Sequence, residues 1–220
     1  MVPCRYWVSD YGLEHLLNDA VHLSDAGHTA LGKRFANWLR SSSLAADAFR
    51  LVGAIGNYYH RYGGASHFGQ PTQNEFASVF GGAVQNFSNK WAIYWHERTG
   101  AHSIKWGTAI GNRYQSERWE LGYLGYPATD EYAYAYGAAQ EFYHPSTGYR
   151  AIILWSEKTG ARMVNQRGAI HQLYLAAGGP SRLGFPVVDE ARDTDGVVRV
   201  RYSSGAVISW TESRGVWISY

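Results

Sequence analysis

The spacing of apolar residues predicts a helix near the beginning of the chain. Ser24 is suited to cap this helix, and the apolar residues that follow it fall on one helical face. These residues are Ala30, Leu31, Phe35, Trp38 and Leu39. The serines at 41–43 predict the end of the helix and the start of a short linker over 44–50.

Farther along the chain, helical spacing is confined to short stretches and most of the pattern is that of strands. Residues 54–62 and 169–177 have helical spacing, and both stretches end at a glycine pair. Segments rich in β-branched and aromatic residues predict strands. They span 83–87, 92–95, 152–155, 197–202 and 206–210. Tyrosines alternate at 132, 134 and 136, which predicts a further strand with three rings on one face.

Six marked positions recur three times in the same order, which identifies residues 51–220 as tandem repeats. Each copy begins with Ala-Ile, has a Tyr four residues later, and continues with Gly-x-Pro and then a Glu four residues after the proline. A Trp completes the motif, with a Gly five residues beyond it. The positions assigned a structural role in the repeat are Gly69, Pro71, Glu75, Trp95, Gly125, Pro127, Glu131, Trp155, Gly184, Pro186, Glu190 and Trp210.

The middle copy is longer than the other two between its proline and its tryptophan. The distance from Pro to Trp is 24, 28 and 24 residues, and the extra residues of the middle copy fall in the turn-forming sequence at 144–148. We therefore expect this insertion at the tip of a hairpin.

These patterns predict an α+β, β-rich fold with three tandem units of about 55 residues, each with a short helix and hairpin strands, after an N-terminal helical segment. One such unit has little core by itself and is expected to pack on its neighbours. The pattern leaves open whether the units form an open stack or a closed ring, and it leaves the oligomeric state open. The expected boundaries are 1–43 for the N-terminal segment, 44–50 for the linker, and 51–105, 106–165 and 166–220 for the units.

Composition supports a folded, turn-rich chain and excludes several classes of protein. Of 220 residues, 25 are Gly and 45% are apolar, while only 17% are charged, which excludes a disordered chain. The net charge of +2 is too small to indicate nucleic-acid binding, and no apolar run is long enough to span a membrane. The single cysteine, Cys4, cannot form an internal disulfide. No His/Cys spacing predicts a metal site, and we expect no cofactor.

Aromatic residues are the first candidates for ligand contacts. Trp95, Trp155 and Trp210 stand at one fixed place in each repeat, where a Trp is more often a core residue than a sugar-stacking platform. Aromatic residues that vary between the copies are better candidates, although the three alternating tyrosines fit a ligand platform and an interface with the next unit equally well. These candidates are Trp106, Trp119, Tyr132, Tyr134, Tyr136 and Trp217.

One carboxylate and one tyrosine recur in every copy. Glu75, Glu131 and Glu190 either accept hydrogen bonds from carbohydrate hydroxyls, act as general acids, or tie down backbone N–H groups of the preceding turn. One carboxylate per unit gives no close pair of the kind found in glycosidases. We expect the recurring tyrosines in the core with hydrogen-bonded hydroxyls, and they are Tyr59, Tyr114 and Tyr174.

The tetrapeptide Leu183-Gly184-Phe185-Pro186 has variant copies at 124–127 and 68–71, and the flanking Gly-Ala-Ile, Trp and Thr-Gly-Ala sequences recur with it. The third copy departs from this pattern, with Arg-Gly-Val at 214–216. The repeat resembles the LGFP repeat family over residues 51–220. This resemblance implies a cell-envelope module of mycolic-acid-bearing actinobacteria, which is appended to envelope enzymes and holds them at the wall.

Residues 19–28 read Asp-Ala-Val-His-Leu-Ser-Asp-Ala-Gly-His, with the predicted helix behind them. This block resembles the last sequence block of SGNH (GDSL-type) hydrolases. The resemblance implies that Asp19 is the orienting acid and His22 the general base of a serine hydrolase. The Gly-Asp-Ser and Gly-x-Asn-Asp blocks of that family do not occur in this sequence. We therefore expect the incomplete triad to be inactive here and the chain to be the C-terminal part of a larger hydrolase.

The function that these resemblances imply is non-catalytic binding or anchoring at the cell wall, outside the cytoplasm. The expected partner is a wall polysaccharide, arabinogalactan or peptidoglycan. An SGNH-type esterase or acyltransferase, whose nucleophile and oxyanion blocks are missing from this chain, is the alternative. A structural spacer between an enzyme and the membrane is a third possibility.

Overall fold

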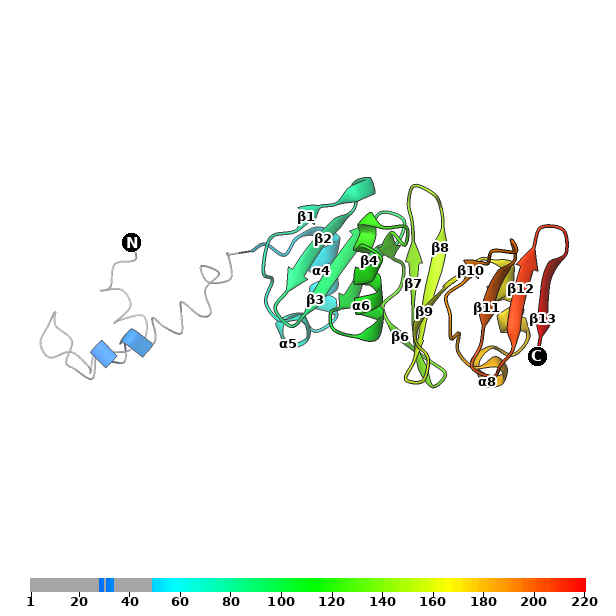
Figure 1. The fold of residues 1–220 in the computed structure, drawn as a ribbon. Coiled ribbons are helices and arrows are strands. Elements are labelled where there is room, and N and C mark those ends of the chain that lie inside the picture. The colour runs from blue at the N-terminus through cyan, green and yellow to red at the C-terminus, as the bar shows by residue number, and fades with distance from the viewer. Residues whose placement is uncertain (1–27, 30, 34–48) are drawn as a thin grey trace, which may run out of the picture. The chain divides into compact units, whose positions relative to one another are not determined.

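The structure is a computed structural model that describes residues 28–29, 31–33 and 49–220 (Figure 1). The chain divides into two compact units, 1–49 and 50–220. In the first unit, residues 28–29 and 31–33 are helical and lie within the helix predicted after Ser24. Asp19 and His22 lie outside the described residues, and their assignment to a triad stays a prediction.

The unit 50–220 contains three antiparallel sheets that follow one another along the chain (Figure 1). Sheet 1 consists, in spatial order, of β1 (Phe76–Ala77), β2 (Ala83–Phe87), β3 (Trp91–His96) and β4 (Gly100–Lys105). Sheet 2 consists of β5 (Tyr126–Pro127), β7 (Gly137–Tyr143), β8 (Arg150–Ser156) and β9 (Gly160–Asn165), and β6 (Tyr132–Tyr134) also pairs with β7. Sheet 3 consists of β10 (Ala191–Arg192), β11 (Val198–Arg201), β12 (Val207–Thr211) and β13 (Gly215–Ser219).

Helices precede each of the three sheets. The helices before sheet 1 are α4 (Gly53–Arg61) and α5 (Gly64–Phe68), and the short 3-10 helix η2 (Val79–Gly81) lies between β1 and β2. Between sheets 1 and 2 lie α6 (Ala109–Ser116) and η3 (Trp119–Leu121). Between sheets 2 and 3 lie α7 (Ala169–Ala176) and α8 (Gly179–Leu183). The helices predicted at 54–62 and 169–177 and the five predicted strand segments are confirmed to within two residues at each end.

The middle unit confirms one local prediction and corrects another. The insertion at 144–148 lies at the tip of the β7–β8 hairpin, where the His144 N–H donates to the Tyr149 carbonyl at 2.9 Å. The strand predicted through 136 ends at Tyr134, because Ala135 adopts a left-handed backbone with φ of +51°. Tyr136 therefore lies beyond the strand, and the three tyrosines do not share one strand face.

Each helix between two sheets packs against both of them. Ile110 and Tyr114 of α6 share one core cluster with residues of sheets 1 and 2. The Tyr114 ring lies 5.5 Å from that of Tyr94 in sheet 1 and 5.0 Å from that of Phe142 in sheet 2. In the same way, α7 shares a cluster with sheets 2 and 3. The unit 50–220 is therefore a series of alternating helix and sheet layers, in which each repeat completes its core with its neighbour.

The recurring tyrosine joins each helix to the Gly-x-Pro turn that follows it. The hydroxyls of Tyr59, Tyr114 and Tyr174 donate to the carbonyls of the glycines in these turns, at 2.9, 2.8 and 2.9 Å. Gly125, one of these glycines, has a φ of +68°, and a Cβ there would lie 2.3 Å from the Tyr143 carbonyl oxygen. The expectation of core tyrosines with bonded hydroxyls is confirmed, and the turn requires glycine for its conformation and for space.

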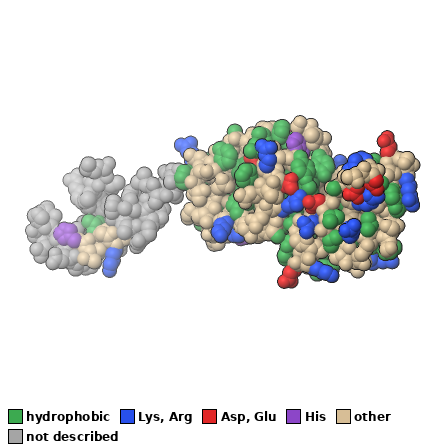
Figure 2. Space-filling model, viewed as in Figure 1, with side chains coloured by type: hydrophobic (Ala, Val, Ile, Leu, Met, Phe, Trp, Pro, Cys, Tyr) green, Lys and Arg blue, Asp and Glu red, His purple; other side chains and the backbone are tan. Residues whose placement is uncertain are grey.

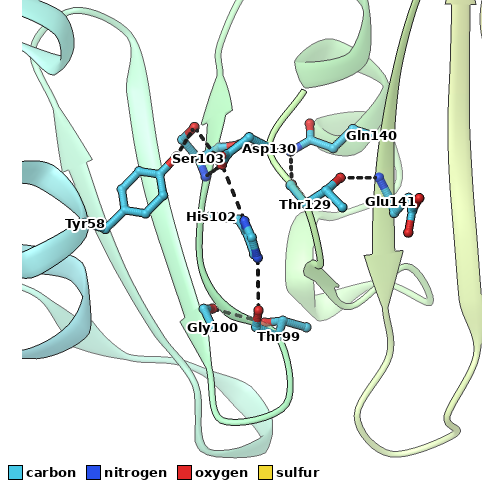
Figure 3. Close-up of polar contacts among 9 residues, drawn as sticks. All are labelled: Tyr58, Thr99, Gly100, His102, Ser103, Thr129, Asp130, Gln140 and Glu141. Atoms are coloured by element: carbon cyan, nitrogen blue, oxygen red, sulfur yellow. Dashed lines mark hydrogen bonds and ion pairs between the residues drawn. The ribbon is translucent and has the colours of Figure 1, made fainter. Parts of the chain in front are cut away.

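A half-buried polar junction ties successive layers together at Asp130 (Figure 3). The Asp130 Oδ1 atom accepts hydrogen bonds from the Tyr58 hydroxyl of α4 at 2.6 Å and from the Ser103 N–H of β4 at 2.9 Å. The His102 Nδ1 atom lies 3.5 Å from the same oxygen. Burial favours the neutral acid, but hydrogen bonds from His102, Tyr58 and the Ser103 amide outweigh it and lower the pKa of Asp130.

The junction between sheets 2 and 3 repeats this arrangement with different donors. Asp189 accepts from the Met163 N–H of β9 at 2.9 Å, and its other oxygen lies 2.9 Å from the Arg113 guanidinium of α6. Each aspartate thus links its own loop to the last strand of the preceding sheet and to the helix before that sheet. The sequence comparison passed over these aspartates, although each stands directly before a recurring glutamate.

Candidate functional site

Two surface grooves lie where a sheet meets the helix that follows it. The first, called the aromatic groove here, has a volume of about 480 Å³. It lies between sheet 1 and the α6–η3 segment. Its lining residues are Phe76, Val84, Asn86, Tyr94, Trp106, Gln115, Trp119 and Glu120.

The second groove, called the charged groove here, lies between sheet 2 and α7 and has a volume of about 360 Å³. Its lining residues are Tyr132, Tyr134, Glu141, Arg150, Ile152, Gln166, Arg167, His171, Gln172 and Leu175.

The two grooves occupy equivalent places in their repeats. The Trp106 N–H donates to the Lys90 carbonyl at 2.8 Å in one, and the Gln166 N–H donates to the Arg150 carbonyl at 3.0 Å in the other. Four lining positions correspond between the grooves, namely Phe76 with Tyr132, Asn86 with Glu141, Trp106 with Gln166, and Gln115 with Leu175. The two grooves therefore share a place in the repeat and part of their lining, and they differ in the side chains at these and the other lining positions.

Trp119 lines the aromatic groove from a backbone conformation that disfavours it. Its φ is +54°, whereas the equivalent residues of the other copies are Gly64 with +53° and Gly179 with +55°. Arg118, directly before it, also has a positive φ of +69°. A left-handed conformation costs a non-glycine residue on the order of 1 kcal/mol. This copy of the repeat thus has a large aromatic side chain in the groove at a position where glycine would adopt the left-handed backbone without strain.

The remaining lining of the aromatic groove combines exposed rings with polar groups. Phe76 is 44% exposed and Trp119 is 37% exposed, so both rings have faces open to solvent. Glu120 is buried beside them and accepts a hydrogen bond from the Ser78 hydroxyl. Aromatic faces with a few polar side chains are the usual lining of small-ligand sites. The groove can stack flat apolar surfaces and accept or donate hydrogen bonds at their edges.

The charged groove has a different balance of groups. The Tyr132 and Tyr134 rings meet edge to face at 6.3 Å, and the Tyr132 hydroxyl donates to Glu141 Oε1 at 3.3 Å. Burial, together with the Glu141 charge, raises the pKa of Tyr132 to about 12. His171 is only 4% exposed, and burial lowers its pKa. On the face of the unit 50–220 seen in Figure 2, acidic side chains lie mainly over the half that contains sheets 2 and 3.

The structure brings four of the six candidate aromatic residues into the grooves and places two elsewhere. Trp106 and Trp119 line the aromatic groove, and Tyr132 and Tyr134 line the charged groove. Tyr136 is 63% exposed, and its ring lies 4.9 Å from that of Phe185. Tyr134 also contacts Phe185, at 6.1 Å, so the tyrosines contribute to a groove and to packing on the next layer.

Trp217 lies on the outer face of sheet 3. Its strand neighbours Val216 and Ile218 pack on the α7 core, so Trp217 points to the opposite face. The Arg214 guanidinium lies 4.1 Å from the centre of its ring. No lining residue of either groove comes from this face.

The recurring tryptophans and glutamates lie away from both groove linings. Trp95, Trp155 and Trp210 are half-buried and pack against the three core clusters. Glu190 Oε2 accepts a hydrogen bond from the Asn165 N–H of the preceding sheet at 3.0 Å. Glu75 is half-buried and Glu131 is exposed. The three glutamates stand in separate loops, one before each sheet.

The lining residues of the charged groove that sequence reasoning missed include Arg150, Arg167 and His171. Two of them stand where another copy has glycine: Gly107 corresponds to Arg167, and Gly111 to His171. The same substitution of a repeat glycine marks Trp119. A comparison of the copies at their glycine positions is the signal that finds these residues.

The family model of the LGFP repeat matches residues 68–122 and 124–181, which together are slightly more than half of the chain. The chain belongs to the LGFP repeat family. No match was found among curated proteins. Each groove lies entirely within one matched segment, so in this family the sheet and the helix that follows it are one repeat.

The match corrects the number of the predicted repeats, and its segments begin at other positions than the predicted units. The expected units begin with a helix, whereas the LGFP match begins near the Gly-x-Pro turn and ends after the next helix. Two repeats are matched where three were expected. The third tetrapeptide, at 183–186, is followed by sheet 3 without a further helix, so residues 183–220 contain only part of the matched pattern.

Two further features bear on partners. None of the described helices is long and apolar enough to cross a membrane. Within the described part of the chain, no group of three His, Cys, Asp or Glu side chains is placed to hold a metal ion.

Proposed function

We propose that this chain is a non-catalytic module that binds a cell-wall polysaccharide and anchors an attached envelope protein outside the cytoplasm. The observation that carries the proposal is Trp119, which lines the aromatic groove from a left-handed backbone. Membership of the LGFP repeat family is consistent with a cell-wall-associated module. In this proposal, residues 183–220 are a third, partial LGFP repeat.

The chemistry of the aromatic groove suits neutral sugar rings. A pyranose or furanose ring has apolar C–H faces and a rim of hydroxyls. The exposed rings of Phe76 and Trp119 offer flat surfaces for the faces. Asn86, Gln115 and Glu120 offer amide and carboxylate groups for the rim. Arabinogalactan, which is built of neutral sugars, is the ligand that this lining favours over peptidoglycan.

Co-sedimentation with purified cell walls of a mycolic-acid-bearing actinobacterium, before and after removal of arabinogalactan, tests the proposal. We expect the chain to sediment with intact walls and to stay in solution with stripped walls. Trp119→Gly should abolish most of this binding, because it removes the stacking surface. Arg118→Gly is the matched control. It puts glycine at the neighbouring residue, which also has a left-handed backbone, and it leaves the groove lining unchanged.

Three outcomes contradict the proposal. They are no sedimentation with intact walls, equal sedimentation with intact and stripped walls, and wild-type sedimentation of the Trp119→Gly variant. Circular dichroism of each variant shows whether a loss of binding is accompanied by a loss of fold.

The resemblance of residues 19–28 to an SGNH hydrolase block extends the proposal to the attached protein. In this extension, the module holds an envelope esterase at its substrate, and Asp19 and His22 belong to that enzyme. Ester hydrolysis by the chain, lost in His22→Ala, would instead favour the catalytic alternative.

A further inference from the structure

The charged groove contains three basic or imidazole side chains that have no counterpart in the aromatic groove. Arg150, Arg167 and His171 all contribute to its lining. The equivalent positions of the aromatic groove are Lys90, which does not line it, and two glycines. The difference is therefore concentrated on one side of a shared architecture and gives this groove a cationic wall.

The two arginines come from segments that pair with one another. The Gln166 N–H donates to the Arg150 carbonyl at 3.0 Å, and Arg167 follows Gln166 directly in the chain. The Arg150 guanidinium lies 4.9 Å from the centre of the Tyr143 ring. Among the described residues, neither arginine forms an ion pair, whereas Arg113 and Arg199 each pair with two carboxylates. Two unpaired guanidinium groups remain to bind an anion.

Glu141 is the one acidic residue of this lining. It accepts the hydrogen bond from the Tyr132 hydroxyl and forms no ion pair with Arg150 or Arg167 within the described part of the chain. Two guanidinium groups against one carboxylate leave a net positive charge in the groove. The groove therefore attracts an anionic group more strongly than a neutral or cationic one.

His171 adds a buried polar atom without a partner. Its side chain is 4% exposed and lines the groove, and its Nδ1 atom has no hydrogen-bond partner among the described residues. The equivalent residue of α6 is Gly111, where a Cβ would lie 2.0 Å from the Lys105 carbonyl oxygen. A buried polar atom without a partner destabilises the folded chain, and a hydrogen bond from a ligand offsets this cost.

We propose that the charged groove binds a sugar unit that bears an anionic group, a carboxylate or a phosphate. Arg150 and Arg167 bind the anion, the Tyr132 and Tyr134 rings contact the sugar, and His171 hydrogen-bonds to it. The proposal rests on the proposed function only in taking this unit to be part of a wall polymer. The module then recognises two chemistries, with neutral sugars in the aromatic groove and an anionic unit in the charged groove.

Calorimetric titration of the full chain with three soluble probes tests this inference. The probes are a galacturonic acid trisaccharide, galactose 6-phosphate and a neutral galactose trisaccharide. We expect at least one anionic probe to bind, and to bind more weakly as salt is raised, because its charge is recognised. The neutral trisaccharide should show no salt-dependent binding. Binding of the uronate alone assigns the anion as a carboxylate, and binding of the phosphate alone assigns it as a phosphate ester.

Variants locate this binding in the charged groove. Arg150→Ala and Arg167→Gly should each weaken the anionic probe about tenfold, as expected for the loss of a charge-assisted hydrogen bond. Lys90→Ala is the matched control, because it removes a cation at the equivalent position that lies outside both groove linings. It should leave the affinity unchanged.

The inference is overturned if neither anionic probe binds, if the neutral probe binds as tightly as the anionic ones, or if the arginine variants bind like wild type. Trp119→Gly separates it from the proposed function. Loss of wall sedimentation with unchanged binding of the anionic probe shows that the two grooves act separately. Binding of the anionic probe without any wall sedimentation supports the groove assignment while contradicting the proposed function.

Discussion

The aromatic and charged grooves share a backbone design and differ in what they expose to a ligand. In the first, Phe76 and Trp119 present open ring faces, while the second presents two arginines and a buried imidazole. Three of the residues that create this difference, Trp119, Arg167 and His171, stand where another repeat has glycine. The comparison teaches that positions where one copy has glycine are places where another copy acquires separate chemistry.

The layers that carry the grooves are tied by different polar groups, and this gives the largest expected effect on stability. Asp130→Ala should lower the free energy of unfolding by about 2 kcal/mol, because the Tyr58 hydroxyl and the Ser103 N–H lose their shared acceptor. Asp189→Ala should cost about 1 kcal/mol, because Arg113 keeps its ion pair with Glu117 at 2.7 Å. Urea denaturation followed by tryptophan fluorescence measures both values.

Asp130→Asn serves as the control for the first junction, because it keeps an acceptor, as Asn74 does at the start of the unit 50–220. Its free energy of unfolding should fall by less than that of the alanine variant. Equal losses for Asp130→Ala and Asp189→Ala would show that the two junctions contribute alike and that their different donors do not matter.

Trp119 offers a second, smaller test of the comparison, because stability and binding should respond differently to it. Trp119→Gly should be more stable than Trp119→Ala by about 1 kcal/mol, since alanine keeps a Cβ at a φ of +54° and glycine does not. Both variants remove the ring and should lose wall binding to the same extent. Thermal unfolding of the two proteins, measured beside wall sedimentation, checks this expectation.

Gly179, the equivalent residue of the next repeat, allows the opposite substitution, from glycine to alanine. Gly179→Ala should destabilise the chain by about 1 kcal/mol at the equivalent φ of +55°, although no atom lies closer than 3.8 Å to the added Cβ. If Trp119→Ala were as stable as Trp119→Gly, the left-handed backbone would carry no strain, and the main support for the proposed function would be lost.

The local elements of this fold were predictable because each depends on neighbouring residues. The spacing at 54–62 and the β-branched segment at 83–87 specify α4 and β2 directly. Part of the lining of the aromatic groove was predicted, because Trp106 and Trp119 differ from their counterparts in other copies and so stand out in the sequence.

What sequence reasoning did not reach depends on pairing between distant segments. Arg150 and Arg167 come together through the pairing of β8 with β9, and nothing in either segment alone predicts a shared groove. The matched repeats begin at other positions than the predicted units for a related reason. Because α6 packs on the sheets before and after it, its sequence position does not show to which sheet it belongs.

His171 gives the smallest expected effect on stability. It also distinguishes the two grooves most sharply, because the equivalent residue beside the aromatic groove is Gly111. Burial lowers the pKa of His171 in the folded chain below the value of about 6.5 for an exposed imidazole. The unfolded chain therefore binds a proton more readily. The contribution of His171 to stability is fully present above pH 6.5 and is lost as the pH falls towards the folded pKa.

Replacing His171 with glycine, the residue at the equivalent position of α6, should remove this pH dependence of the free energy of unfolding. The variant loses about 1 kcal/mol at every pH, because glycine is a poor helix residue. Its free energy of unfolding should therefore approach that of the wild type as the pH is lowered from 7.5 to 5. The other histidines are present in both proteins, so the difference between the two denaturation series isolates His171. A difference that stays constant, or widens towards acid, would mean that this imidazole is not held neutral in the groove and has no need of a ligand to satisfy it.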